Sequence, residues 1–442
     1  MRSTLATALL ALLLGAMVGL TTVKLGSVQH QLKALLITVA GLTMVVAALR
    51  PQAGLLILLA LSAFQFPFYG TNSNQVLLVS LALVLGWRIR ARSIPAWASA
   101  GGFALVAGSV LAALGAHDRA VAAEGAIDWL AAIMVLFVAL SVLRERRDAA
   151  RRAVDILTAS AVIVVIFGFL QKAGVHALVG APFNAGRPNS FFSYYTVYAG
   201  YVAMIATLAT AEILIALDER RYLRAWLFGA ALVFMLAGLT GSTSRGGLLA
   251  LAGGWLMLLA LNIQRGSVLA RIAVVVVVFA AAGYAVTPRS TLVTLEHRFA
   301  ASNGALGEDK TRFALQRAGK TALAKYPFGL GYGNFRFYLS QNVRSSNIRQ
   351  PFFHAQETFV QVGLDAGWIG LLGFVTLLFW PILAVFRRGK GGTSVVRATA
   401  FAAALGGFIA QGLYDYVLWD LPFVIFFVTM LWGVTHSLRV DD

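Results

Sequence analysis

The chain has 442 residues, of which 59% are apolar and 12% are charged. Water-soluble domains are about half apolar and about a quarter charged, so this composition excludes an ordinary soluble protein. The formal net charge is +18. The basic residues fall between apolar runs and form no recognition motif, which argues against a nucleic-acid partner. The chain has no cysteine, which excludes disulfides and thiolate metal sites.

Apolar runs recur along the whole chain, and a helix needs about 20 mostly apolar residues to cross a membrane. Fourteen segments meet or nearly meet this length, near residues 4–23, 33–49, 53–69, 75–89, 97–116, 124–143, 153–172, 195–217, 225–241, 247–263, 270–286, 364–386, 397–415 and 418–437. No convincing cleavage site follows the first, so we expect an uncleaved span there. The sequence predicts an all-α polytopic membrane protein with about 12–14 transmembrane helices.

The basic residues predict the orientation, because Lys and Arg accumulate in cytoplasmic loops. With the N-terminus inside, the cytoplasmic segments hold twenty Lys and Arg residues. The short loops on the opposite side hold only six, which are Lys24, Lys33, Arg119, Lys172, Arg187 and Arg245. We therefore expect both termini to be cytoplasmic.

Two external connections, 173–194 and 287–357, are longer than the rest, and long loops are exempt from the charge rule. About seventy residues without structure would be unusual, so the second should be folded or functional. Its residues 309–326 favour a helix, which Pro327 ends. The predicted organisation is therefore transmembrane helices over 1–286, a partly helical periplasmic loop over 287–357, and C-terminal transmembrane helices over 358–442.

The first polar cluster on the external side is Gly186-Arg187-Pro188-Asn189-Ser190. Asn189 or Ser190 can cap the helix that follows. Arg187 would then lie near a helix N-terminus, where backbone N–H groups favour an anion. The alternative is a loop arginine that reaches the lipid headgroups.

The second cluster is the short connection Thr240-Gly241-Ser242-Thr243-Ser244-Arg245-Gly246-Gly247. An external arginine is disfavoured unless it has a function. The guanidinium of Arg245 suits phosphate, and Ser244 stands beside it as a supporting hydroxyl. An interfacial anchor with a glycine-rich turn is the equally weighted alternative.

The third cluster combines a glycine-dependent turn, Pro327 to Phe335, with His354 and Glu357 just before the next span. If 354–357 is helical, His354 and Glu357 share a face, and the carboxylate would make the imidazole a better general base. A structural histidine is the alternative. No cluster has metal-ligand spacing, so we expect neither metal nor cofactor. A donor activated as a lipid diphosphate fits this, because arginine can stabilise its leaving group.

In order along the chain come Arg187-Pro-Asn, Ser-x-Ser-Arg245-Gly, Arg312, Pro327-x-Gly-x-Gly-x-Gly-Asn-Phe335, His354 and a glycine-rich run that begins at Gln361. This set resembles the O-antigen ligase and O-antigen polymerase superfamily over residues 186–374. Many members carry His-x-x-His-Asn near the histidine, whereas this chain reads His354-Ala-Gln-Glu357.

The resemblance implies a donor glycan on undecaprenyl diphosphate, held by Arg187, Arg245 and Arg312. It implies that His354 helps to deprotonate the acceptor, with inversion and without metal, and that Asn189, Ser244 and Glu357 support the site.

The leading hypothesis is a ligase that transfers polysaccharide to a sugar hydroxyl of lipid A–core, at the periplasmic side of the bacterial inner membrane and among its lipids. An O-antigen polymerase and a protein O-oligosaccharyltransferase use the same donor. A lipid or solute transporter is the alternative from another class, and it would depend on Glu212, the ionisable residue closest to the middle of a span.

Overall fold

The structure is a computed structural model that describes residues 41–64, 67–68, 71–144, 146–175, 186–300, 307–343, 354–388, 392–418 and 420–439. The predicted span 4–23 and residues 33–40 of the span 33–49 lie outside the described residues, whereas residues 41–49 are helical. Each of the other twelve predicted spans coincides with one helix.

Within the described residues, nine helices are long and apolar enough to cross a membrane. They are α5 (Ala96–Gly115), α6 (Arg119–Val142), α7 (Ala149–Lys172), α8 (Tyr195–Asp218), α9 (Tyr222–Gly241), α11 (Gly266–Val286), α15 (Thr358–Arg388), α16 (Thr393–Gly412) and α17 (Leu421–Arg439). Shorter apolar helices are α3 (Pro51–Leu61), α4 (Ser73–Leu85) and α10 (Arg245–Leu261). The expected polytopic helical fold is confirmed.

Two short 3₁₀ helices, η1 (Gly86–Arg88) and η2 (Ala91–Ser93), connect α4 to α5. The predicted span 53–69 is too long, because α3 ends at Leu61. The chain then forms an antiparallel ladder of the two-residue strands β1 (Pro67–Phe68) and β2 (Thr71–Asn72). Proline lacks the N–H that continuing the helix to residue 69 would need.

Helix α8 lies at the centre of the bundle and is buried along nearly its whole length. Small residues allow its neighbours to approach closely. A Cβ added at Gly254 of α10 would lie 2.4 Å from Thr207 of α8, for example. In contrast, α11 buries only Ile272 and Gly283 among its residues and exposes a valine-rich surface. Such a surface suits contact with lipid rather than water.

Helix α15 is broken at Gly367, where φ is 67° and ψ is −176°. The glycine turn predicted at Pro327 to Phe335 packs into this break. The N–H groups of Leu330 and Gly331 donate to the carbonyl of Leu364, at 2.6 and 3.2 Å, and the N–H of Trp368 donates to the carbonyl of Pro327 at 2.9 Å. Backbone groups that the break frees are thereby satisfied by the turn.

The described residues of the long connection form three helices. They are α12 (Arg289–Ala300), α13 (Gly307–Lys325) and α14 (Phe335–Asn342). The predicted helix 309–326 corresponds to α13, which ends just before the Pro327 turn. Leu315 and Ala322 of α13 form a small core with Phe335 and with Leu364 of α15. This core fixes α13 against the membrane helices.

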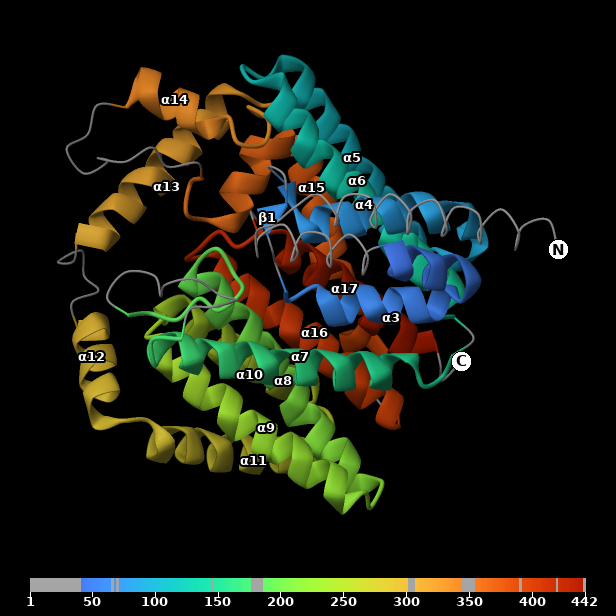
Figure 1. The fold of residues 1–442 in the computed structure, drawn as a ribbon, viewed down its shortest axis with the longest axis vertical. Coiled ribbons are helices and arrows are strands. Elements are labelled where there is room, and N and C mark those ends of the chain that lie inside the picture. Colours follow the sequence, from blue (N-terminus) through green and yellow to red (C-terminus); the bar gives the residue numbers. More distant parts are fainter. Residues whose placement is uncertain are drawn as a thin grey trace, which may run out of the picture.

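The three connection helices lie together at one end of the bundle, on the left of the view in Figure 1. We call this the loop end. The connections α7–α8, α9–α10 and α16–α17 meet there as well. The other end, where α17 finishes, is the opposite end. Arg439 there donates to the carbonyl of Ser93 at 2.8 Å, which joins α17 to η2.

Candidate active site

Arg245 is the first residue of α10, and Ser244 is the N-cap. The Ser244 hydroxyl accepts a hydrogen bond from the N–H of Gly247 at 3.2 Å. Both residues are buried. The Arg245 guanidinium donates to both carboxylate oxygens of Asp309, at 2.5 and 3.0 Å, and to the carbonyl of Arg298 at 3.1 Å. The guanidinium of Arg245, for which phosphate binding was one interpretation of the sequence, therefore binds the carboxylate of Asp309 on α13.

Asp309 had no predicted role, and its position explains the fixed placement of α13. It accepts a third hydrogen bond, from the Tyr414 hydroxyl at 3.0 Å. Burial alone would raise the pKa of Asp309, but the hydrogen bonds and positive charge of Arg245 lower it below its ordinary value. Asp309 is thus held as a carboxylate. Its only sequence signal is the general preference for acidic residues in the first turn of a helix.

Arg312 lies one turn further along α13 and points at the α16–α17 connection. Its guanidinium donates to the carbonyl of Tyr414 at 2.6 Å and lies 3.3 Å from the carboxylate of Asp415. It also stacks 4.0 Å from the centre of the Tyr414 ring. Burial lowers the pKa of Arg312, but the charge of Asp415 and smaller contributions from neighbouring groups outweigh this and raise the pKa overall. Arg312 therefore carries its charge in a nearly enclosed position.

Arg187 stacks on Tyr195, the first residue of α8, with 4.7 Å between the guanidinium carbon and the ring centre. The predicted position near a helix N-terminus is confirmed. The predicted cap is wrong, because α8 begins after Tyr194 and no side chain caps it. Asn189 instead bonds to Gln171 of α7 through its side chain and its N–H, at 2.8 and 2.9 Å. It anchors the loop that carries Arg187.

His354 lies in the non-helical segment that precedes α15, and Glu357 does not share a face with it. The helical premise was wrong, because α15 begins only at Thr358. Glu357 instead pairs with Lys320 of α13 at 3.2 Å. His354 packs against the Tyr416 ring, with 5.5 Å between ring centres. Burial, and then the charge of Arg312, lower the pKa of His354 to about 4. The imidazole is therefore neutral at neutral pH.

A chain of contacts joins the predicted arginines. Arg245 lies 5.5 Å from the centre of the Tyr414 ring, on which Arg312 also stacks, and Tyr195 is close enough to Arg312 to influence its pKa. Arg187 covers the Tyr195 ring. Three guanidinium groups from separate connections thus surround two tyrosines, and His354 is near Arg312. This arrangement suits a polyanionic group next to a neutral base.

The sequence did not identify several residues of this site. Tyr195, Tyr414, Asp415 and Tyr416 all belong to it. Their common signal is position, because each lies in a connection or at the start of a helix at the same end of the bundle as Arg245. Among the described residues, no three His, Cys, Asp or Glu side chains form a group that could hold a metal ion.

Residues 230–375 match the family model described as O-antigen ligase. The match runs from α9 into α15 and includes Arg245, Asp309, Arg312 and His354. Arg187 and the α16–α17 connection lie outside it. No curated protein matches the chain.

Proposed function

We propose that this chain is a glycosyltransferase of the O-antigen ligase superfamily that uses a lipid-diphosphate-linked glycan, because residues 230–375 match the O-antigen ligase family model. The donor is a polysaccharide on undecaprenyl diphosphate, and the acceptor is a sugar hydroxyl of lipid A–core. The protein lies in the bacterial inner membrane with both termini in the cytoplasm. The loop end faces the periplasm and carries the reaction.

The observation that carries the proposal is the grouping of Arg187, Arg245 and Arg312 beside a neutral histidine at the loop end. A departing lipid diphosphate needs stabilisation of its developing charge, and guanidinium groups fixed in advance supply it. Arg312 and Arg187 are partly accessible, whereas Arg245 is buried against Asp309. Donor phosphate therefore binds Arg312 and Arg187 first and competes with Asp309 for Arg245.

The transfer step is a displacement at the anomeric carbon. The acceptor oxygen forms the new bond while the bond from the anomeric carbon to the diphosphate oxygen breaks, so the configuration inverts. The electron pair of the broken bond leaves with the diphosphate, next to the arginines. The acceptor proton passes to a neutral nitrogen of His354. The family's enzymes act on lipid-linked glycans, and no step here requires a metal ion.

His354 gains basicity when the donor binds. The charge of Arg312 is one of the two causes of its lowered pKa, after burial. A bound diphosphate would neutralise Arg312 and remove that contribution. The base would therefore be stronger in the complex with donor than in the free enzyme, where proton transfer is not needed.

The same donor site would serve an O-antigen polymerase or a protein O-oligosaccharyltransferase, which differ only in the acceptor. The transporter alternative has less support. Glu212, on which it depended, lies near the opposite end of α8 and is paired with Arg224 at 2.8 Å and with Arg397 at 3.1 Å.

Purified protein mixed with undecaprenyl-diphosphate-linked glycan and lipid A–core tests the proposal. We expect lipid A–core that carries the glycan, together with released undecaprenyl diphosphate. Movement of intact donor across a vesicle membrane without bond formation would instead establish a transporter. In a deletion strain, long polymer left on the carrier lipid indicates a ligase, whereas core with single repeat units indicates a polymerase.

A further inference from the structure

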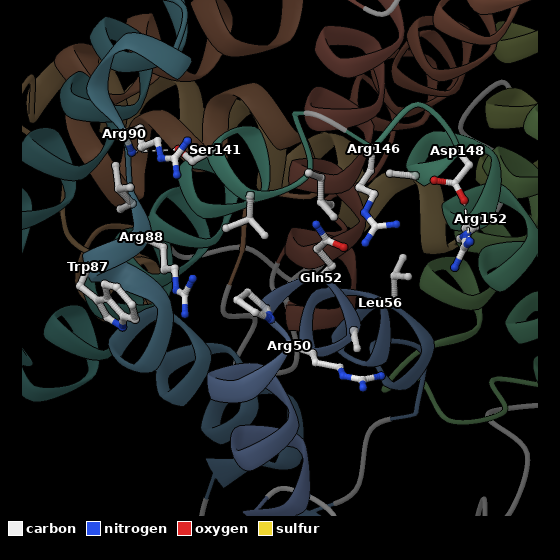
Figure 2. Close-up of a pocket in the computed structure, with 16 residues that line it drawn as sticks. Arg50, Gln52, Leu56, Trp87, Arg88, Arg90, Ser141, Arg146, Asp148 and Arg152 are labelled. Atoms are coloured by element: carbon white, nitrogen blue, oxygen red, sulfur yellow. Dashed lines mark hydrogen bonds and ion pairs between the residues drawn. The ribbon is translucent and has the colours of Figure 1, made fainter. Parts of the chain in front are cut away.

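The opposite end of the bundle holds a cavity of about 680 Å³ that the proposed reaction does not use. Its lining comes from the start of α3, from η1 and the residues after it, and from the connection between α6 and α7. Five arginines contribute to it, which are Arg50, Arg88, Arg90, Arg146 and Arg152. Figure 2 shows that Arg88 and Arg90 reach in from one side and Arg146 from another, with Gln52 between them.

The positive charge of this cavity is nearly uncompensated within the described residues. Of the five arginines, only Arg152 has a carboxylate partner, Asp148 at 2.6 Å. Arg88 stacks on the exposed ring of Trp87 at 4.1 Å, and its Nε atom is buried without a hydrogen-bond partner. Like charges gathered around one space repel each other unless an anion occupies it.

An apolar slot adjoins the basic cavity. It is lined by residues of α3, α6 and α17, including Leu59, Leu136 and Val428. Leu56 and Leu143 line both spaces, so the slot lies directly beside the cavity. A basic cavity with a leucine-lined slot beside it matches a molecule with an anionic head and an apolar chain.

We propose that this cavity binds an anionic glycerophospholipid, with the headgroup phosphate among the arginines and an acyl chain in the slot. Basic pockets between membrane helices recognise such headgroups. Trp87, at the rim, is an amphipathic side chain typical of the membrane interface. The inference is independent of the proposed transferase activity, because no residue of the cavity belongs to the candidate active site.

The first test compares two triple variants of the full-length protein in detergent micelles. One replaces cavity arginines (Arg88→Gln, Arg90→Gln and Arg146→Gln). The other makes the same charge change at the same end but outside the cavity (Arg92→Gln, Arg144→Gln and Arg147→Gln). Bound phosphatidylglycerol is measured by native mass spectrometry, with phosphatidylcholine as the zwitterionic reference.

We expect the cavity variant to bind phosphatidylglycerol about a hundredfold more weakly than wild type, since each basic residue contributes roughly one factor of five. The control variant should lose less than a few-fold. An equal loss in both variants, or equal retention of the two lipids by wild type, would overturn the proposal, because the arginines would then act only as surface charge.

The second test separates a lipid from a soluble phosphate. Leu56→Trp should fill the junction of cavity and slot, weakening phosphatidylglycerol binding while leaving binding of inorganic phosphate and glycerol phosphate unchanged. Displacement of the lipid by inorganic phosphate at similar concentrations, or normal lipid binding by Leu56→Trp, would show that the cavity recognises phosphate alone and would contradict the lipid assignment.

Discussion

Two clusters of ion pairs, one at each end of the bundle, both combine arginines with carboxylates. They differ in the structural elements that carry these side chains. At the opposite end, Glu212 of α8 accepts from Arg397 of α16 and from Arg224 of α9, and Arg224 also pairs with Asp155 of α7. At the loop end, Arg245 forms an ion pair with Asp309, and Arg312 forms one with Asp415. All members of the first cluster lie on membrane helices, whereas the second joins membrane helices to α13.

This difference in position indicates that buried ion pairs can serve either to stabilise the fold or to bind a ligand. Four packed helices share the Glu212 cluster, so its partners cannot separate without disturbing the core. At the loop end, two members of the cluster lie on α13. This helix is held against the bundle mainly by a small apolar core and by these same ion pairs. An anionic ligand can therefore replace a carboxylate there, since phosphate fits the arginine fork as well as carboxylate does.

The largest predicted effect is on stability at the opposite end. Glu212→Ala would leave the buried Arg397 and the partly buried Arg224 without their shared partner, and breaking a buried pair typically costs about 3–5 kcal/mol. We expect a large fall in thermal stability and abundance, with normal turnover per folded molecule. The control, Glu219→Ala, removes a more exposed pair with Arg221 and should cost about 1 kcal/mol or less. Normal stability of Glu212→Ala would remove the structural role assigned to the cluster.

At the loop end, the predicted effect is on activity. Arg312→Gln should lower transfer by about 10²–10³-fold, the usual loss when one group that stabilises developing charge is removed. Stability should change little, because burial already raises the pKa of Asp415 and this carboxyl can take up a proton once Arg312 is gone. Transfer is measured with purified protein and lipid-linked donor, and Arg317→Gln, on an exposed face of the same helix, is the control.

If Arg312→Gln instead lost stability and kept its turnover, the two clusters would have the same structural role and the comparison would fail. Equal activity loss in Arg317→Gln would show that the whole helix, rather than one guanidinium, is sensitive to charge.

The sequence predicted the helices well because each membrane span needs its own apolar run, which is a local signal. It also singled out Arg245 as a basic residue in a short external turn, where phosphate binding and an interfacial anchor were equally weighted interpretations. Asp309 could not be found in this way. Its partner is 64 positions away in the chain, and only the packing of α13 brings the two together.

His354 and Glu357 show the limit of reasoning by spacing. Residues three apart meet on a helix, but α15 begins one residue after Glu357. The glycine turn gives the opposite lesson. Gly329, Gly331 and Gly333 all have positive φ, which their pattern indicated. The break at Gly367 that receives this turn lies inside an apolar run and had no comparable signal.

A smaller predicted effect distinguishes two roles of Asp309. If its carboxylate competes with donor phosphate for Arg245, Asp309→Asn should lower the KM for donor about tenfold, equivalent to about 1.4 kcal/mol. If Asp309 only positions Arg245, KM should rise. Steady-state kinetics with lipid-linked donor separate these results, and Glu296→Gln on α12 is an exposed control. A raised KM would mean that the ion pair is as permanent as the Glu212 cluster.

The smallest predicted effect concerns the pH dependence of His354. A general base acts in its neutral form, so activity is present above the pKa of His354 and is lost as pH falls through it. With that pKa at about 4 in the free enzyme, kcat/KM should stay constant from about pH 8 down to about pH 5. Arg312→Gln removes a cation that lowers this pKa, so the acid limb should move upward. The shift should be about one pH unit or less, because burial is the larger cause of the lowered pKa and persists in the variant.

His354→Ala should still bind donor but lose turnover. If the acid limb did not move in Arg312→Gln, the base would lie elsewhere. The same conclusion would follow if the residual activity of His354→Ala kept an unchanged acid limb. The arginines would then be the catalytic part of the loop-end cluster.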